Sequence, residues 1–316
     1  PHSIHARSLR HRSTADEHEL ALNHYRQAIK IDPKFVAAYV AIANEQVVQA
    51  MFSTDTRVEI FNEARIAVQT ALALDPNYGE AYTVQAAIKF YMDKDWEAAE
   101  EAFKKAIRLD ENNSIAKIRY AFFLTTMRRF DEALVLAEKA AELDPISISS
   151  LHNLGWVNLV AGNYAAAEKA FGEALEIHPN WIWGYVKRGY SHAFQGNCES
   201  ALKDQQKARE LLGDWGNELI ESCLIFILDQ CDFQELKAEA TKRYLSRINP
   251  DNYTDPMAMA FLYCSNENNE ECLHWLQVAI DEEITAFYQF NLDFAYPKEI
   301  LEDPRFIRMK EYLDLP

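Results

Sequence analysis

The sequence of 316 residues predicts an all-α protein: a right-handed α-solenoid of about seven to eight helix pairs with a C-terminal cap. Three observations support this fold class: a segment that recurs about every 34 residues, small residues in fixed register within it, and few turn residues. The chain has 9 glycines and 10 prolines, too few for a β-rich fold with many tight turns. Because 49% of its residues are apolar, it can bury a large core.

The period is visible where the second helix of each copy closes. Successive closing residues are separated by 34 residues in the middle of the chain, and by a longer step of 43 residues before Pro76. A proline just after a helix cannot continue it and turns the chain back. The closing residues are Pro33, Pro76, Glu111, Pro145, Pro179, Gly213 and Pro250.

Small residues recur at one position in each helix of the pair. At these facing positions they let the paired helices approach closely, and a large residue such as Phe103 or Phe171 then fills the space to the next copy. The small residues are Ala87, Ala121, Gly155 and Gly189 in the first helix, and Ala64, Ala99, Ala133, Ala167 and Ala201 in the second.

The array divides into three parts, which we expect to form one continuous solenoid. Residues 1–213 hold the regular repeats, with an insertion near 51–60 that lengthens one hairpin. Residues 214–282 still read as helix pairs but have lost the repeat pattern, and the aromatic-rich residues 283–316 are the predicted cap. The basic, histidine-rich start of the chain indicates the end of a longer upstream segment, so we expect a fragment of a larger protein.

The 34-residue pattern resembles the tetratricopeptide repeat superfamily over nearly the whole chain. Residues 72–113 and 120–147, together with the EDPRF sequence at 302–306, are similar to one bacterial group of such arrays. Arrays of that group follow a winged-helix transcription regulator or a nucleotide cyclase, often with a membrane helix between. The resemblance therefore implies a sensor or partner-binding domain of a bacterial signalling protein.

Several functional classes are excluded by what the sequence lacks. It contains no nucleotide-binding, metalloprotease or serine-hydrolase motif, and its histidines show no metal-ligand spacing, so we expect no enzyme, no metal and no cofactor. The net charge of -17 would repel nucleic acid, so direct contact with it is not expected. No apolar run is long enough to insert into a membrane.

The first helices of such an array line its concave groove, where extended peptides or partner helices bind. The repeat register indicates which side chains face this groove, and in the central copies they combine large aromatic rings with cationic and amide groups. Aromatic side chains provide contact area, and Arg and Lys could hold a carboxylate. The predicted partner-binding residues are Ile118, Arg119, Phe122, His152, Asn153, Trp156, Trp183, Lys187, Tyr190 and Phe194. Upstream, the same positions include Asn44 and Val84.

A structural interpretation competes with this one, because an aromatic residue on a helix often just packs between neighbouring repeats. Arg119, Asn153 and Lys187 favour binding, since they share one repeat position that a strictly buried site would seldom accept. The clamp that binds chaperone tails in some repeat proteins needs a Lys and an Asn at two positions that are Ile118 and Phe122 here. A co-chaperone role is therefore disfavoured.

Two other functions stay open beside the signalling domain. The chain could be a free-standing scaffold for a multiprotein complex, or a self-association module in which the C-terminal face forms a homodimer. Localisation depends on the upstream sequence: periplasmic if a membrane helix precedes the array, and cytoplasmic otherwise.

The five cysteines, at 198, 223, 231, 264 and 272, form no metal-binding motif. The favoured interpretation is that they are buried, unpaired small hydrophobic residues. A disulfide between Cys223 and Cys231, or between Cys264 and Cys272, is the alternative in an oxidising compartment, because each pair is eight residues apart and could span a helix hairpin.

Overall fold

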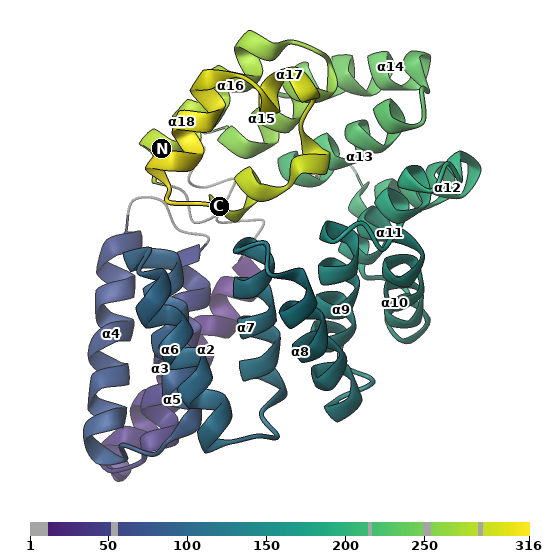
Figure 1. Ribbon diagram of the computed structural model, residues 1–316. Coiled ribbons are helices and arrows are strands. Elements are labelled where there is room, and N and C mark those ends of the chain that lie inside the picture. The colour runs from purple at the N-terminus through teal and green to yellow at the C-terminus, as the bar shows by residue number, and fades with distance from the viewer. Residues whose placement is uncertain (1–11, 52–55, 214–216, 249–253, 284–286) are drawn as a thin grey trace. The chain divides into compact units, whose positions relative to one another are not determined.

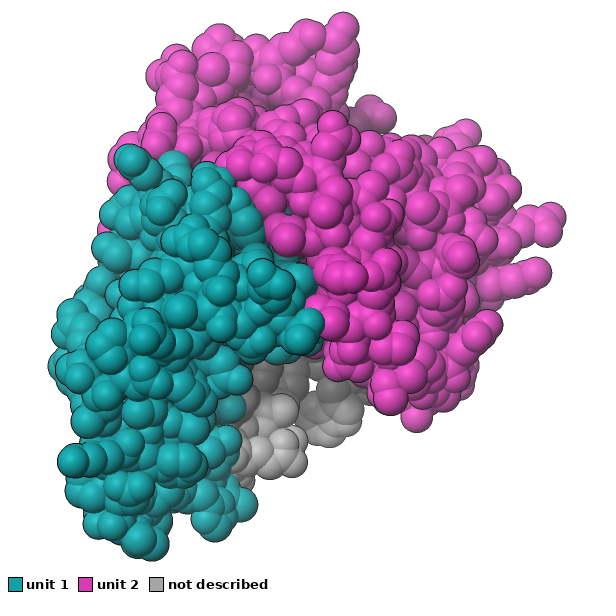
Figure 2. All heavy atoms as spheres, turned by 60° about the horizontal axis from the view of Figure 1, so that its bottom comes forward, with its two compact units in different colours: residues 1–123 teal, residues 124–316 magenta. Residues whose placement is uncertain are grey.

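The computed structural model describes residues 12–51, 56–213, 217–248, 254–283 and 287–316, and these ranges consist of helices and connecting turns, without a strand (Figure 1). The chain divides into two compact units, residues 1–123 (unit 1) and 124–316 (unit 2), which are coloured separately in Figure 2. The predicted all-α class and helical solenoid are confirmed. The handedness and the continuity of the array across both units stay predictions.

Unit 1 consists of a leading helix followed by helix pairs. Its helices are α2 (Arg12–Ile31), α3 (Val36–Met51), α4 (Arg57–Leu74), α5 (Gly79–Ile88), which continues as the π-helical turn η1 (Lys89–Asp93), α6 (Trp96–Leu109), and α7 (Ser114–Thr126), which crosses the boundary between the units. Helices α3 and α4 have 16 and 18 residues, compared with 13 and 14 in the regular pair that follows in unit 2. The predicted insertion thus lengthens both helices of this hairpin, although residues 52–55 lie outside the described ranges.

Unit 2 continues the alternation of first and second helices and adds a C-terminal segment. Its pairs are α8 (Phe130–Leu143) after α7, α9 (Ile148–Val160) with α10 (Tyr164–Ile177), α11 (Ile182–Phe194) with α12 (Cys198–Leu212), α13 (Glu218–Gln230) with α14 (Gln234–Leu245), and α15 (Pro256–Ser265) with α16 (Asn269–Asp281). The segment comprises η3 (Phe287–Asn291), η4 (Asp293–Ala295), α17 (Lys298–Leu301) and α18 (Pro304–Tyr312).

In the turns between pairs, the residues around the closing proline make specific hydrogen bonds, which explains why aspartate often precedes it. The Asp75 N–H donates to Ala71 O and ends α4, and the Asp75 carboxylate then accepts from the Asn77 N–H at 2.9 Å. Six residues after each of three closing prolines a tyrosine follows, and its hydroxyl donates to the proline carbonyl, as Tyr82 does to Pro76 at 2.9 Å. These contacts give hydrogen-bond partners to backbone groups of the turn between the two helices.

The same dipeptide starts helices in the C-terminal part. The Asp255 carboxylate caps α15 by accepting from Met257 and Ala258 N–H groups, with Pro256 in the first turn. Asp303 and Pro304 begin α18 in the same manner. Asp-Pro therefore follows a helix in the regular repeats but begins a helix at α15 and α18. Both places suit proline, because neither requires it to donate an intrahelical N–H hydrogen bond.

Within a pair, the small residue of the first helix packs on the large residue of the second, whereas Phe171 was predicted to fill the space to the next copy. A Cβ added to Gly155 of α9 would lie 2.6 Å from a ring carbon of Phe171 on α10, and Phe171 is fully buried. Glycine at 155 thus makes room for the ring that closes the pair. No described helix is long and apolar enough to span a membrane.

The interpretation of the cysteines as unpaired is wrong for four of them. Cys198 at the start of α12 is bonded to Cys231 at the end of α13, and Cys264 is bonded to Cys272 across the turn between α15 and α16. The alternative pair Cys223–Cys231 is also wrong, because eight residues along one helix separate two side chains by about 12 Å, far beyond a disulfide. Cys198 and Cys231 are 33 residues apart, close to one repeat, so stacking of neighbouring copies brings them together. The alternative pair Cys264–Cys272 is confirmed.

Candidate functional site

The first helices of unit 1 enclose a cavity of about 270 Å³. Ala37, Val40, Ala41 and Asn44 of α3, Glu80, Thr83 and Val84 of α5, and Asn113, Ile115 and Arg119 at α7 line it. Its walls therefore come from the first helices of three successive repeats. They include Arg119, Asn44 and Val84, which the repeat register predicts to face the groove. We call this surface the first-helix face of unit 1.

Arg119 is the charged group of this cavity. One of its terminal nitrogens, Nη2, donates to Oδ1 of Asn44, while Nη1 is buried without a hydrogen-bond partner among the described residues. Burial lowers the pKa of Arg119 because it disfavours the charged form. An arginine side chain nevertheless stays protonated at pH 7, so its charge is poorly solvated here. The hydroxyl oxygen of Thr83 is likewise buried and unpaired. Donors without a partner favour the binding of a ligand that supplies an anionic or other acceptor oxygen.

The other two predicted residues of unit 1 are less suited to binding. Phe122 packs edge to face on the buried Phe90 of η1, with ring centroids 6.2 Å apart. Ile118 is half-buried and does not line the cavity. For Phe122 this contact fits the structural interpretation, in which the aromatic residue packs between neighbouring repeats.

In unit 2, the predicted residues of α9 and α11 form a cluster around Lys187. The Lys187 ammonium lies 3.8 Å from the ring centroid of Trp156 and 5.5 Å from that of Trp183. Burial lowers the pKa of Lys187 to about 8. Burial, together with the charge of Lys187, lowers the pKa of His152 to about 3, so His152 is neutral at pH 7. Asn153 is 3% exposed.

The remaining two predicted residues, Tyr190 and Phe194, contact the chain's own C-terminal segment. The Phe294 ring of η4 lies 6.2 Å from Tyr190 and 5.4 Å from Phe194, centroid to centroid. The segment is anchored further back by the Asn291 side-chain amide, which donates to Thr126 O at 2.7 Å, and by an ion pair of 2.7 Å between Asp293 and Arg128. The first-helix face of unit 2, formed by α9, α11 and α13, is thus partly covered by residues 287–295.

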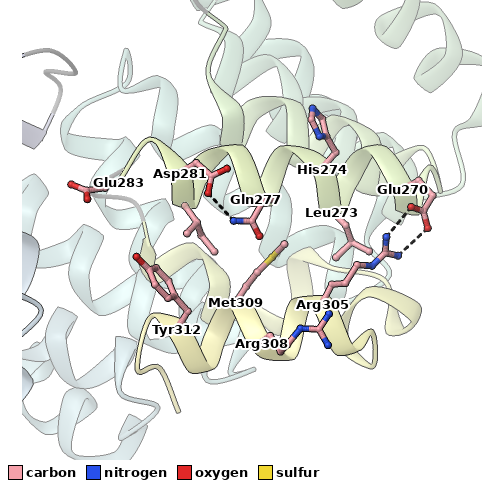
Figure 3. A pocket seen from close by; sticks show the side chains of 11 residues that line it. Glu270, Leu273, His274, Gln277, Asp281, Glu283, Arg305, Arg308, Met309 and Tyr312 are labelled. Carbon is pink, nitrogen blue, oxygen red and sulfur yellow. Dashed lines mark hydrogen bonds and ion pairs between the residues drawn. The ribbon is translucent and has the colours of Figure 1, made fainter.

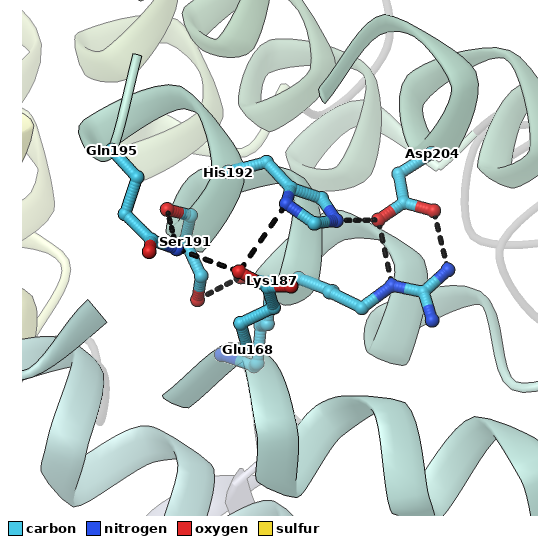
Figure 4. A network of polar contacts seen from close by, with 7 residues as sticks. Glu168, Lys187, Ser191, His192, Gln195 and Asp204 are labelled. Carbon is cyan, nitrogen blue, oxygen red and sulfur yellow. Dashed lines mark hydrogen bonds and ion pairs between the residues drawn. The ribbon is translucent and has the colours of Figure 1, made fainter. Parts of the chain in front are cut away.

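Sequence reasoning missed a polar network that joins α10, α11 and α12 (Figure 4). Arg188 makes a bidentate ion pair with Asp204 at 2.8 and 2.7 Å, and the His192 ring lies between Asp204 and Glu168 at 3.6 and 3.5 Å. Gln195 adds a hydrogen bond of 2.8 Å to Glu168. One signal in the sequence could have indicated it. Arg188 follows the predicted groove residue Lys187, and consecutive residues on a helix point in different directions, so Arg188 had to face another helix or solvent.

A second surface that the sequence did not indicate is a cavity of about 780 Å³ between α16 and α18 (Figure 3). On its wall the guanidinium of Arg305 binds both carboxylate oxygens of Glu270 at 2.8 and 2.9 Å. No group of His, Cys, Asp or Glu side chains within the described ranges could hold a metal ion.

Comparisons with known proteins agree with the repeat architecture. Two family models, both described as tetratricopeptide repeat, match residues 90–154 and 149–181. The type IV pilus assembly protein PilF of Pseudomonas aeruginosa is 28% identical over 120 residues, which are 37% of this chain and 47% of that protein. The chain spans less than half of the length of the first curated relatives it matches.

Two solved structures share the fold. The structure of PilW, a widely conserved type IV pilus biogenesis factor, is 19% identical and covers 65% of this chain and 93% of that chain, with a TM-score of 0.55. A chain of the APC/C hetero-tetramer is 16% identical and covers 83% of this chain and 48% of that chain, with a TM-score of 0.59. At these identities the likeness concerns the helical fold alone.

Proposed function

Because this chain belongs to the tetratricopeptide repeat superfamily, we propose that it is a non-catalytic protein-interaction domain that binds a protein or peptide segment on the first-helix face of unit 1. The observation that carries the proposal is the cavity of about 270 Å³ that Arg119 lines, together with the buried Nη1 of Arg119, which has no hydrogen-bond partner among the described residues. The bound segment places an acidic side chain or a terminal carboxylate against Arg119.

The cavity's size and polarity suit part of a peptide rather than a free metabolite. Pockets for drug-sized ligands are usually about 300–1,000 Å³, and this cavity lies just below that range. Thr83 and Asn44 offer hydrogen bonds beside Arg119, while Val40, Val84 and Ile115 offer apolar contact. One anchoring side chain with its flanking backbone fits this combination.

The proposed context is that of a sensor or partner-binding domain in a bacterial signalling or transcription-regulatory protein, as the resemblance of residues 72–147 suggests. In this context the regulated activity belongs to another part of the protein, and unit 1 recruits or senses a partner. The alternative is a scaffold that assembles a multiprotein complex through the same face.

A pull-down from native lysate, read by mass spectrometry, tests the binding face. The variant Arg119→Glu should lose a partner that the wild type retains, by about tenfold or more, since the guanidinium–carboxylate contact becomes repulsive. Arg108→Glu on α6 makes the same charge change at an exposed residue and should retain the partner. Equal retention by both variants, with unchanged helicity in circular dichroism, would refute the proposal.

The two disulfides of unit 2 bear on the compartment in which the chain folds. Disulfides persist in oxidising environments and are rare in the cytosol, so we infer that unit 2 folds in an oxidising compartment. Protein purified without reductant from its native host should show one titratable thiol in denaturant, that of Cys223. Five titratable thiols would contradict this inference.

Self-association is supported by a different surface. Tyr312 and Ile307 of α18 are 71% and 44% exposed, and Tyr312 lines the cavity shown in Figure 3. Sedimentation velocity of the wild type and of Tyr312→Ser/Ile307→Ser would show a shift from dimer to monomer if α18 forms a homodimer. A monomeric wild type would rule out this function.

A further inference from the structure

Unit 2 contains a second cavity, of about 790 Å³, with a chemistry opposite to that of the cavity in unit 1. It lies where the ends of α11 and α13, the turn from α15 to α16, and the residues that follow η4 meet. We propose that this cavity binds an organic cation, an alkylammonium or guanidinium group, over a floor of aromatic rings and within a rim of carboxylates.

The floor consists of rings that surround Phe194. The Tyr164 ring stacks on Phe194 with centroids 4.9 Å apart, and the rings of Phe294 and Phe226 meet it edge to face at 5.4 and 6.1 Å. Phe226 is 6% exposed, whereas Tyr164, Phe194 and Phe294 are half-buried and available to the cavity. Aromatic faces attract cations that lie within about 6 Å of the ring centroid.

The rim is acidic. Asp229, Glu267, Asp293 and Glu299 line the cavity, and none of the described residues that line it is basic. Asp229 and Asp293 are already paired, with Lys237 and Arg128, each at 2.7 Å. Glu267 and Glu299 are exposed and have no ion-pair partner among the described residues. Two carboxylates therefore remain available for a bound cation.

The combination of rings and carboxylates selects for positive charge. An anion would meet the acidic rim and the negative face of the rings, and a neutral apolar molecule would gain nothing from the carboxylates. An ammonium or guanidinium group can contact both, because its charge suits the carboxylates and its hydrocarbon part packs on the rings. The cavity between α16 and α18 differs in charge, since Arg305 and Arg308 line it together with its carboxylates.

Two structural features hold the site in place. The Cys264–Cys272 disulfide closes the turn that carries Glu267, and Cys264 itself lines the cavity. The buried hydrogen bond from Asn291 to Thr126 fixes the residues that precede Asp293 and Phe294. The cation site thus needs the C-terminal segment in its observed position, and it is independent of the proposed partner site in unit 1.

Isothermal titration with N-acetyl-L-arginine amide tests the proposal, with N-acetyl-L-citrulline amide as the uncharged compound of nearly the same shape. We expect the arginine compound to bind and the citrulline compound to bind at least about tenfold more weakly. The affinity for the arginine compound should fall as salt rises, because the rim is exposed. No binding of the arginine compound, or equal binding of both compounds, would overturn the proposal.

Variants locate the binding to this cavity. Glu267→Gln/Glu299→Gln should weaken binding of the arginine compound by about tenfold. Glu138→Gln/Glu311→Gln removes the same number of charges from exposed sites elsewhere in unit 2 and should leave the affinity unchanged. Equal affinities of the two double variants would contradict the site. These exposed carboxylates contribute little to the core, so folding is preserved.

A neutral seven-residue peptide with one central arginine distinguishes the two sources of the cation. If it binds more tightly than the arginine amide, the natural ligand is a basic side chain of a partner; equal affinity indicates a free organic cation. Either result supports the cation site. Because Arg119→Glu affects only the unit 1 cavity, it should leave this titration unchanged even if the proposed partner binding fails.

Discussion

The first-helix faces of the two units have the same repeat register but different surroundings. In unit 1, α3, α5 and α7 leave a cavity whose Arg119 and Thr83 keep unpaired polar atoms. In unit 2, residues 287–295 lie on the equivalent face, and Phe294 contacts the predicted groove residues Tyr190 and Phe194. Equivalent positions are thus a candidate binding surface in one unit and part of a packed interior in the other.

This difference shows that register determines which way a side chain faces, while distant residues decide whether that face is free. Phe194 lies at a predicted groove position and does line a cavity, but one built with the C-terminal segment and surrounded by carboxylates. Its predicted ligand, an acidic group, would be repelled there. The polarity of a groove therefore has to be worked out for each unit separately.

The largest expected effect tests whether the C-terminal segment is integral to unit 2. Phe290 is fully buried and stacks on Phe306 with centroids 6.0 Å apart. Phe290→Ala should lower the free energy of unfolding by about 3–5 kcal/mol because it leaves a cavity in the core. Chemical denaturation measures this change. A loss below about 1 kcal/mol would mean that the segment is a removable occupant of the face rather than part of its core.

The next effect concerns the anchor that brings the segment back to α7. Asn291→Leu removes the buried hydrogen bond to Thr126 O, which should cost about 1–3 kcal/mol. The matched variant Asn163→Leu changes an exposed asparagine whose side chain makes no capping bond. If the two variants lose equal stability, the anchor does not hold the segment.

A pH experiment tests whether solvent is excluded from His152 on the first-helix face of unit 2. The pKa of His152 is lowered from 6.5 to about 3, so between these values the unfolded chain binds the proton first. Stability should therefore fall as pH drops from about 6.5 towards 3, by on the order of 2 kcal/mol for a ring that is only half-buried.

Urea denaturation at pH 7 and pH 4 checks this dependence. In His152→Gln the part of the pH effect due to this ring should disappear. His178→Gln removes another half-buried histidine and should keep the effect. A pH effect of the same size in His152→Gln and in the wild type would show that solvent reaches the ring.

The smallest effect is expected from the exposed anchor. Arg128 and Asp293 have side chains that are 36% and 47% exposed, so their ion pair should contribute only about 0.2–1 kcal/mol. Arg128→Gln should lose this stability at low salt and match the wild type at 0.5 M salt or above, measured by thermal unfolding. A loss that persists at high salt would mean that Arg128 acts through packing.

Much of the fold was predictable because its signals are local. The Asp-Pro closing turns depend on residues within six positions, as the contact of Tyr82 with Pro76 shows. The small residues of the paired helices, such as Gly155, recur in a register that the sequence shows, although the contact of Gly155 with Phe171 inside one pair was not predicted. The disulfide Cys198–Cys231 was not predicted although its spacing is close to one repeat, because the disulfide alternative paired cysteines eight residues apart, as in Cys223–Cys231.

The sequence by itself determined the all-α class, the helix pairs, the turns that separate them and the side of each first helix that carries Arg119 or Lys187. Only the tertiary structure decided that Asn291 contacts Thr126. The C-terminal segment held by this contact covers part of the first-helix face of unit 2 and forms part of an acidic, aromatic cavity. The physical reason is range: period and turn chemistry act over a few residues. The contact between Asn291 and Thr126 joins residues 165 apart, and no pattern in the sequence records it.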